Sequence, residues 1–272
     1  KKKKLIITTR GSDVLVLIKE LFELNKNFLG KLLYGLIKSG FKKSNYVTCT
    51  STKQIEYLRK DVLNTNHNLS LIKTGVEVDV IKKHNEPCLI DLPLDKKVVF
   101  SIRFIGPVYN MDYQIEAIKE LPLSLRKSLC FVFIKGNSVQ ESFFQDFLGK
   151  LEDIEGLDFK ILDSISQLEI WSLIKRSDLV YMVPISDGTP NSALETMAAR
   201  KPLIMGDLGY NNELFNRVSL IAKLSFPKSL ASAIESGLNS YPEVLLDNGF
   251  NKVSKFGSRQ SEMKKLLKIY QE

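Results

Sequence analysis

Two carboxylates in the C-terminal half of this 272-residue chain stand on either side of a predicted loop and helix start. Asp187 lies in a loop with Gly188, Thr189 and Pro190, and Glu195 lies about one and a half turns into the helix that follows. Gly188 permits close approach of a ligand to the backbone, Thr189 can cap the helix, and Pro190 suits its first position. A capped, solvated surface helix is the other interpretation of these residues.

The elements that position these acids are two apolar segments, Leu179 to Val183 and Pro202 to Met205, which read as buried strands on either side of the helix. A loop between a parallel strand and a helix binds anions because the first helical N–H groups lack partners and the helix dipole is positive there. A carboxylate repels phosphate and prefers a hydroxylated neighbour such as a ribose. The pattern therefore suggests a nucleotide, with phosphates on the loop and sugar hydroxyls on an acid.

The run SDGTPNSALETMAARKPLIMGDLGYNNEL resembles the donor-binding segment of the family 4 retaining glycosyltransferases, which have the two-domain GT-B architecture. In that family two acids separated by seven residues bracket the helix, and Asp187 and Glu195 keep this spacing. Asp187 stands where Glu is commoner. Arg200 replaces the usual Gly at the helix end, which affects only a helix cap.

The resemblance implies roles for several residues. Glu195 would hold the ribose of a nucleotide-sugar donor, the backbone of Gly188 to Asn191 would face its diphosphate or sugar, and Glu213 would lie near the reacting sugar. The predicted nucleobase contacts, in the loop after a short strand, are Asp163, Ser164 and Ile165.

Arg103 ends a predicted strand that begins at Val98, and it matches the diphosphate-binding arginine of the family. A permanent planar cation grips two phosphate oxygens and offsets the charge on a departing nucleoside diphosphate. Asp187, Glu195 and Arg103 are therefore the predicted catalytic set, although a solvated strand-end arginine is the plainer interpretation of Arg103. Val108 stands where relatives commonly carry a lysine, so one phosphate cation is replaced.

The N-terminal segment LIITT reads as a strand, and RGSDVL after it resembles a turn of the family's acceptor domain. Arg10 stands where many members of the family have a histidine near the donor sugar. It either binds a phosphate or a carboxylate in a forked geometry or caps a sheet edge, and both interpretations stay open. A Rossmann domain occupies roughly 150 residues, about twice the length available here. We therefore expect the chain to begin partway through its first domain.

The predicted fold is α/β, with two Rossmann-like domains of which the N-terminal one is incomplete. The expected segments are a partial acceptor-side domain (1–75), a polar, irregular linker (76–97), a nucleotide-sugar domain (98–255) and a C-terminal helix that packs back toward the first domain (256–272). Residues 14–39 read as helical with a break near residues 25–27. Ile165, Leu168, Trp171, Leu173 and Ile174 are expected to form an apolar helix face, with Trp171 in the core.

The composition limits the classes of partner. A net charge of +8 suits anionic lipid or phosphorylated substrates, but no nucleic-acid-binding signature accompanies it. No apolar run approaches the roughly 20 residues of a membrane span. Cys49, Cys88 and Cys130 lack metal-like or disulfide-framework spacing, which favours a reducing, cytoplasmic setting.

The resemblance predicts a retaining glycosyltransferase that uses a nucleotide-diphosphate sugar as donor, with no cofactor and no metal. The expected acceptor is a glycan or a lipid-linked sugar in surface polysaccharide or glycolipid assembly, with peripheral contact at the inner face of the plasma membrane. The alternatives are a non-catalytic nucleotide-sugar binder or partner subunit of another transferase, and a basic protein that binds nucleic acid through its lysines.

Overall fold

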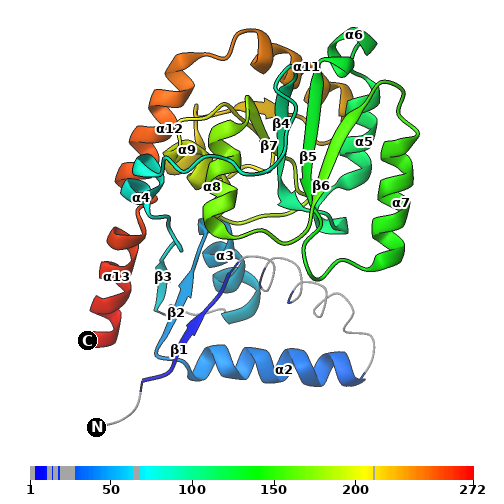
Figure 1. Cartoon of the computed structure of the whole chain (residues 1–272). Helices are drawn as coiled ribbons and strands as arrows, with labels where there is room; N and C mark the ends of the chain where they lie inside the picture. The colour runs from blue at the N-terminus through cyan, green and yellow to red at the C-terminus, as the bar shows by residue number, and fades with distance from the viewer. Residues whose placement is uncertain (1–3, 11–13, 15–17, 19–27, 64–67, 211) are drawn as a thin grey trace. The chain divides into compact units, whose positions relative to one another are not determined.

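The computed structural model describes residues 4–10, 14, 18, 28–63, 68–210 and 212–272. The chain divides into two compact units, which are described separately. The first unit contains residues 1–76, 186–190 and 257–272, and the second contains residues 77–185 and 191–256. Each unit is built on a parallel sheet, which confirms the predicted α/β class (Figure 1).

The second unit contains a six-stranded parallel sheet in the order β6-β5-β4-β7-β8-β9. The strands are β4 (Lys97–Phe104), β5 (Leu129–Ile134), β6 (Asp158–Leu162), β7 (Leu179–Met182), β8 (Leu203–Gly206) and β9 (Leu220–Ala222). All residues of β5, β7 and β8 are buried, since helices cover both faces of the sheet. Together β7, the following helix and β8 form the βαβ unit predicted from the sequence.

Helices α5, α7 and α11 pack on one face of this sheet, over Val99, Phe131 and Tyr181, and α8, α9, α12 and α4 form the opposite layer (Figure 1). The helices of this unit are α4 (Val78–Lys83), α5 (Met111–Lys119), α6 (Leu123–Lys127), α7 (Glu141–Glu152), α8 (Gln167–Arg176), α9 (Asn191–Ala198), α10 (Asn212–Phe215), α11 (Pro227–Asn239) and α12 (Glu243–Phe256), with a 3-10 turn η3 (Pro107–Tyr109).

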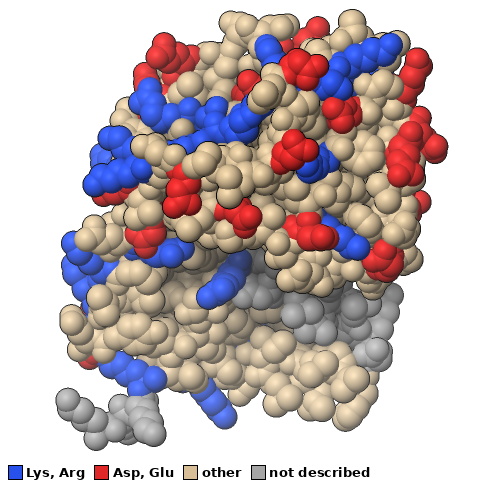
Figure 2. Space-filling model, viewed as in Figure 1, with Lys and Arg blue, Asp and Glu red and all other residues tan. Residues whose placement is uncertain are grey.

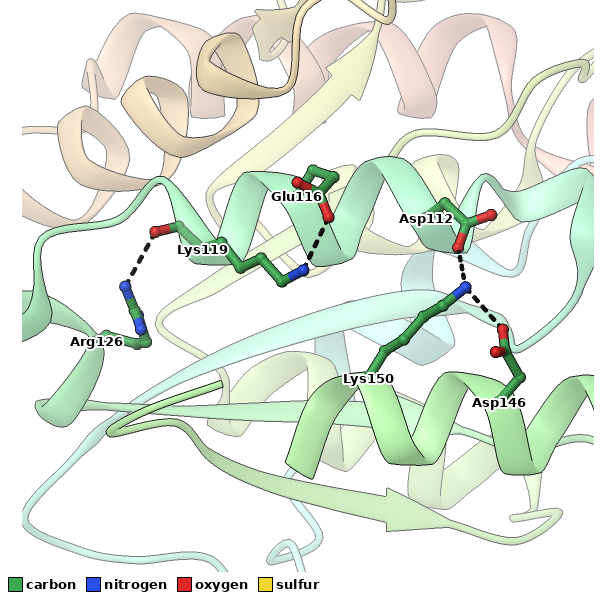
Figure 3. Close-up of polar contacts among 6 residues, drawn as sticks. All are labelled: Asp112, Glu116, Lys119, Arg126, Asp146 and Lys150. Carbon is green, nitrogen blue, oxygen red and sulfur yellow. Dashed lines mark hydrogen bonds and ion pairs between the residues drawn. The ribbon is translucent and has the colours of Figure 1, made fainter. Parts of the chain in front are cut away.

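Charged side chains join α5 and α7 along their solvent edge (Figure 3). Lys150 of α7 pairs with Asp112 of α5 at 2.8 Å and with Asp146 of its own helix at 2.7 Å. These two hydrogen bonds raise the pKa of Lys150. Arg126 donates to the carbonyl of Lys119 at the end of α5, at 3.0 Å. The ion pairs lie at the surface, so the buried aromatic core beneath them supplies most of the helix packing energy.

The first unit contains a three-stranded parallel sheet, β1 (Ile6–Thr8), β2 (Tyr46–Cys49) and β3 (Leu69–Leu71), in that order. Its other elements are α2 (Phe28–Lys43), α3 (Thr52–Tyr57), the π-helix η2 (Leu58–Leu63) and the C-terminal helix α13 (Arg259–Gln271). The core of this unit includes Val47, Cys49 and Leu58. Helix α13 is joined to it by a backbone bridge between Val76 and Ser258.

Two local predictions differ from the structure. The segment expected to be an irregular linker contains α4, because Val78 and Ile81 are three residues apart and are buried together. Leu168, in the first turn of α8, is 46% exposed and does not share the buried face of that helix with Trp171, Leu173 and Ile174. The predicted break near residues 25–27 lies outside the described residues. Within the described part of the chain, no helix combines the length and apolarity of a membrane span.

Candidate functional site

The strand order of the second unit identifies where a ligand would bind. From β4 the chain builds one side of the sheet through β5 and β6, and then returns to the other side of β4 to form β7. In open parallel sheets, ligands bind outside the carboxyl ends of the strands at such a switch point. A cavity of about 160 Å³ lies there, lined by Arg103, Tyr109, Ile170, Ser192 and Glu195 among others.

Arg103 is the half-buried penultimate residue of β4, at the carboxyl end of that strand. Its Nη1 donates a hydrogen bond to the hydroxyl of Ser192, at 3.2 Å, in the first turn of α9. Its guanidinium carbon lies 4.8 Å from the centre of the Tyr109 ring, a cation–π distance. Both contacts hold the cation beside the N-terminus of α9.

Glu195 is half-buried one turn into α9, and its Oε1 accepts a hydrogen bond from Nε2 of Gln167 at 3.0 Å. Gln167 is the first residue of α8, and a capping box fixes that helix start. Ser166 Oγ accepts from the Glu169 N–H at 3.3 Å, and the Glu169 carboxylate accepts from the Ser166 N–H at 2.7 Å. The second hydrogen bond lowers the pKa of Glu169. Local capping of α8 thus orients the acid on α9.

The charge distribution at this cavity suits an anion beside hydroxyl groups. Arg103 and the N-terminal amides of the eight-residue helix α9 supply positive charge on one side. The Oδ1 of Asn191, the first residue of α9, is buried and has no hydrogen-bond partner among the described residues. Glu195 supplies a carboxylate one turn further along the helix. A ligand with phosphate and hydroxyl groups in sequence would match this order.

The remaining predicted residues of the second unit do not line this cavity. Asp163, Ser164 and Ile165 form the loop between β6 and the Ser166 cap, with Asp163 and Ser164 exposed. Glu213 is exposed in the short helix α10. A separate cavity of about 310 Å³ near α10 is lined by Asp207, Asn212 and others.

The other predicted residues belong to the first unit. Asp187 Oδ1 accepts the Gly188 N–H at 2.8 Å, and the Thr189 hydroxyl donates to the carbonyl of Thr50 at 2.5 Å. Pro190 precedes α9, so it is not the first helical residue as predicted, because Asn191 takes that position. Arg10 lines a cavity of the first unit that is described below. The predicted site residues therefore fall into two sets, one in each unit.

Three residues of the site were not predicted from the sequence. Ser192 bonds Arg103, Gln167 bonds Glu195, and the ring of Tyr109 faces the guanidinium. Gln167 carries a local signal, since it lies within the Ser-x-x-Glu pattern of a helix start, between Ser166 and Glu169. Tyr109 lies in the GPVYN run, and Ser192 lies next to Asn191, but neither has a sequence pattern that points to an arginine.

At the end of α9, Arg200 adopts a left-handed backbone conformation, with φ of 54°. Glycine, which is usual at this position in the family that the sequence resembles, would adopt this conformation at no steric cost. Its guanidinium pairs with Asp247 of α12 at 2.5 Å. The substitution therefore changes a helix cap and leaves the cavity residues in place.

Comparisons with known proteins identify the family and the fold of the chain. The family model described as glycosyl transferases group 1 matches residues 89–249, more than half of the chain. No curated protein sequence matches it.

Several solved structures share the fold at low sequence identity. A glycosyltransferase from Rickettsia africae ESF-5 is 16% identical with a TM-score of 0.77, over 99% of this chain and 70% of that one. A UDP-forming α,α-trehalose-phosphate synthase from Burkholderia xenovorans, in complex with glucose-6-phosphate, is 12% identical with a TM-score of 0.81, over 100% and 69%. Anabaena HepE, in complex with UDP and glucose, is 12% identical with a TM-score of 0.78, over 99% and 72%.

Proposed function

The chain belongs to the group 1 glycosyltransferases, and we propose that it is a retaining enzyme that moves a sugar from a nucleotide-diphosphate donor to an acceptor hydroxyl. The observation that carries this proposal is the cavity at the switch point of the six-stranded sheet, where Arg103 and Glu195 meet within one unit. A cation for phosphate and an acid for hydroxyl groups stand there in the order in which a nucleoside diphosphate presents them.

Each of the residues described at the cavity of the second unit has a role in this proposal. Arg103, held by Ser192 and Tyr109, neutralises the diphosphate as it departs. The backbone at the start of α9 binds the same group. Glu195, oriented by Gln167, accepts hydrogen bonds from the ribose hydroxyls. Because Arg103 supplies the positive charge, the proposal needs neither a metal nor a cofactor.

The other predicted residues complete the donor site. We assign the nucleobase to the loop of Asp163, Ser164 and Ile165, and the transferred sugar to Asp187 and Glu213. We assign the backbone of Gly188 to Asn191 to the diphosphate, as the family resemblance implies. In this mechanism the protein stabilises the leaving diphosphate and an oxocarbenium-like centre, and no side chain acts as a nucleophile.

A thermal-shift screen tests the proposal, because a ligand that binds the native state raises its stability. Uridine, guanosine and adenosine diphosphates and their sugars are compared on wild type, Glu195→Gln and Arg103→Gln. The control is Glu235→Gln, which removes an exposed acid of α11 in the same unit. One nucleotide should stabilise wild type and the control, and both site variants should weaken its binding about tenfold or more. Equal binding by wild type and Glu195→Gln would overturn the donor assignment.

A second candidate function is a non-catalytic nucleotide-sugar binder or a partner subunit of another transferase. The observation that favours it is Val108, which stands where relatives commonly carry a lysine. Val108 has no charged side chain to offer a phosphate. Its carbonyl accepts a hydrogen bond from the Ile185 N–H at 2.9 Å. Calorimetric binding of a donor without its hydrolysis or transfer would support this candidate, whereas turnover would rule it out.

A lipid-linked acceptor in surface polysaccharide or glycolipid assembly, at the inner face of the plasma membrane, is part of the proposal. Support comes from α2, whose solvent side carries large apolar residues: Phe28 (83% exposed), Leu29, Leu32, Leu33 and Leu36 (62%). The surface over α2 is largely uncharged (Figure 2). Lys31, Lys38, Lys42 and Lys43 belong to the same helix. An apolar face with flanking lysines suits a helix lying in an anionic lipid surface.

Vesicle sedimentation tests this contact, with phosphatidylcholine vesicles that contain or lack phosphatidylglycerol. The Leu32→Asp/Leu36→Asp variant should lose binding to the anionic vesicles. Val244→Asp, a similarly exposed site of α12 in the other unit, should retain it. Binding that is unchanged by the double substitution would contradict the assignment. The assignment would also be contradicted if the wild-type protein formed a dimer that the double substitution dissociates. In that case the apolar face of α2 would bind a second copy of the chain and not a membrane.

A further inference from the structure

The three-stranded sheet of the first unit has two chemically different faces. Its register pairs Thr8 with Thr48 and Thr48 with Ser70, so these hydroxyl side chains share one face, which also carries Ile6 and Tyr46 toward the start of the strands. Ile7, Val47 and Leu69 occupy the other face and pack in the core of this unit. Strands of a parallel sheet that is covered on both sides are normally apolar on both faces. The hydroxyls of Thr8, Thr48 and Ser70 make this face more polar than that expectation.

A cavity of about 470 Å³ lies on this hydroxyl face at the carboxyl ends of the strands. Its lining includes Arg10 after β1, Thr48 and Thr50 on and after β2, Lys73 and Thr74 after β3, and Arg259 at the start of α13. The Thr48 hydroxyl donates to the Thr8 hydroxyl at 3.0 Å. The volume lies within the range of small-molecule sites. Cations from three separate chain segments thus meet threonine hydroxyls in one place.

The described lining of this cavity contains three cationic side chains and no carboxylate. Lys73 is 2% exposed, and its Nζ lies 3.7 Å from the buried carboxylate of Glu262. The same carboxylate accepts the Lys73 N–H at 2.8 Å and pairs with Lys265 at 2.6 Å. The Glu262 carboxylate therefore forms ion pairs with both Lys73 and Lys265. The exposed side chains of Arg10 and Arg259 add two permanent positive charges at the cavity.

Gly75 fixes the position of Arg259. It adopts φ of +67°, and a Cβ at this position would lie 2.7 Å from both Cα and N of Arg259. This close approach lets the Arg259 N–H donate to the carbonyl of Val76 at 3.0 Å. The start of α13 is therefore held directly against the segment that follows β3, and backbone contacts determine the position of Arg259.

We propose that this cavity binds a phosphate group of the acceptor, so that the acceptor is a phosphorylated sugar or a lipid phosphate. The assignment to an acceptor rests on the function proposed above, in which the second unit holds the donor. Two forked guanidinium groups and several hydroxyls match a tetrahedral anion with three or four oxygens. The cavity is larger than one phosphate, which leaves room for the group that the phosphate carries.

Calorimetric titration with inorganic phosphate tests the site. All variants are made in the Arg103→Gln chain, so that phosphate binding at the donor cavity is weakened. In that background Arg259→Gln and Arg10→Gln should each weaken phosphate binding about tenfold, and Arg259→Lys should weaken it less because it keeps the charge but loses the fork. The control is Lys268→Gln, which removes an equal charge from α13 at an exposed position that does not line the cavity.

The outcomes separate this inference from the donor assignment. Phosphate binding that survives Arg103→Gln and is lost with Arg259→Gln supports the site, whether or not a nucleoside diphosphate binds elsewhere. Loss of phosphate binding with Arg103→Gln alone would place the anion in the second unit and overturn the proposal. Equal weakening by Lys268→Gln and Arg259→Gln would reduce the effect to net charge and would also overturn it. Thermal unfolding of each variant checks that the first unit remains folded.

Two further ligands identify the source of the phosphate. Glucose 1-phosphate represents a soluble acceptor, and a polyprenyl phosphate in uncharged detergent micelles represents a lipid acceptor. The true class should bind more tightly than inorganic phosphate and should lose that gain in Arg259→Gln. If neither ligand binds more tightly than inorganic phosphate, the cavity does not recognise an acceptor and the proposal fails.

Discussion

In the six-stranded sheet, the central strands are buried on both faces. The three-stranded sheet has one apolar face and one mixed face, on which Thr8, Thr48 and Ser70 lie beside Ile6 and Tyr46. The candidate donor cavity therefore uses only the strand ends of the larger sheet and the start of α9. The candidate acceptor cavity uses the face of the smaller sheet as well as its strand ends. A sheet that packs in the core on both faces can offer a ligand only the ends of its strands. A sheet with one face outside the core can also line a cavity with that face.

The largest expected difference between the sheets is in core packing. Phe133 of β5 is fully buried, with its ring 5.3 Å from that of Phe147. Phe133→Ala should destabilise the protein by about 3–5 kcal/mol. Thr48→Ala on the hydroxyl face removes one hydroxyl pair and should cost only about 1 kcal/mol. Calorimetric unfolding of both variants measures the contrast, which would be refuted by equal losses.

Two glycines with similar backbone angles provide a second comparison. Gly75 (φ +67°) and Gly156 (φ +72°) both have a left-handed backbone conformation. Changing either residue to Ala should therefore lower the free energy of unfolding by roughly 1–2 kcal/mol. A Cβ at Gly75 would also meet the backbone of Arg259, while one at Gly156 would meet the movable side chains of Leu123 and Lys127. Gly75→Ala should therefore lower the unfolding temperature more than Gly156→Ala, and it should also weaken phosphate binding. Similar unfolding temperatures for the two variants would show that the start of α13 can move away from residue 75 at little cost in stability, which would contradict this prediction.

The capping boxes of α3 and α8 provide a third comparison. In the first unit the fully buried Gln54 Oε1 accepts from the N–H groups of Thr50 and Ser51, at 2.7 and 3.0 Å. Gln54→Leu leaves both donors buried without this partner, at about 1–3 kcal/mol each. The box of the second unit uses the exposed Glu169, so its loss should cost less. Chemical denaturation of Gln54→Leu and Glu169→Leu gives the order.

The same boxes should differ in their dependence on pH. The pKa of Glu169 is lowered by the hydrogen bond from the Ser166 N–H, so its contribution is present above the ordinary glutamate pKa and is lost as pH falls through the lowered value. The difference in unfolding temperature between wild type and Glu169→Gln should therefore shrink in acid. The effect of Gln54→Leu should stay constant, since an amide does not titrate. A constant difference for both variants would contradict the role of the Glu169 carboxylate.

The smallest effect concerns the cysteines. Burial raises the pKa of the Cys130 thiol in β5 to about 11, and Cys49 in β2 is also buried, whereas Cys88 is half-buried. Since the thiolate is the reactive form, an alkylating reagent at neutral pH should label Cys88 first and the two strand cysteines only on unfolding. Mass spectrometry of a labelling time course identifies the order. Early labelling of Cys49 alone would show that the smaller sheet opens before the larger one.

Much of the fold was predictable because its signals are local. The apolar segments that became β4, β5, β7 and β8 are long enough to read as buried strands, and the Ser51 and Ser166 caps mark helix starts. Helix α4 was missed because only two buried residues, Val78 and Ile81, define its face. The glycosyltransferase family was predictable from the run around α9, where the spacing of two acids survives in the sequence.

The sequence by itself determined the α/β class, the βαβ unit around Glu195 and the presence of an arginine at the end of β4. Only the tertiary structure decided which residues orient them, because Ser192, Gln167 and Tyr109 reach Arg103 and Glu195 from other elements. It also decided that Arg10, Lys73 and Arg259 line one cavity, although Arg10 and Arg259 are 249 positions apart. Strand register and the close approach at Gly75 create that cavity, and neither is encoded in any short stretch of sequence.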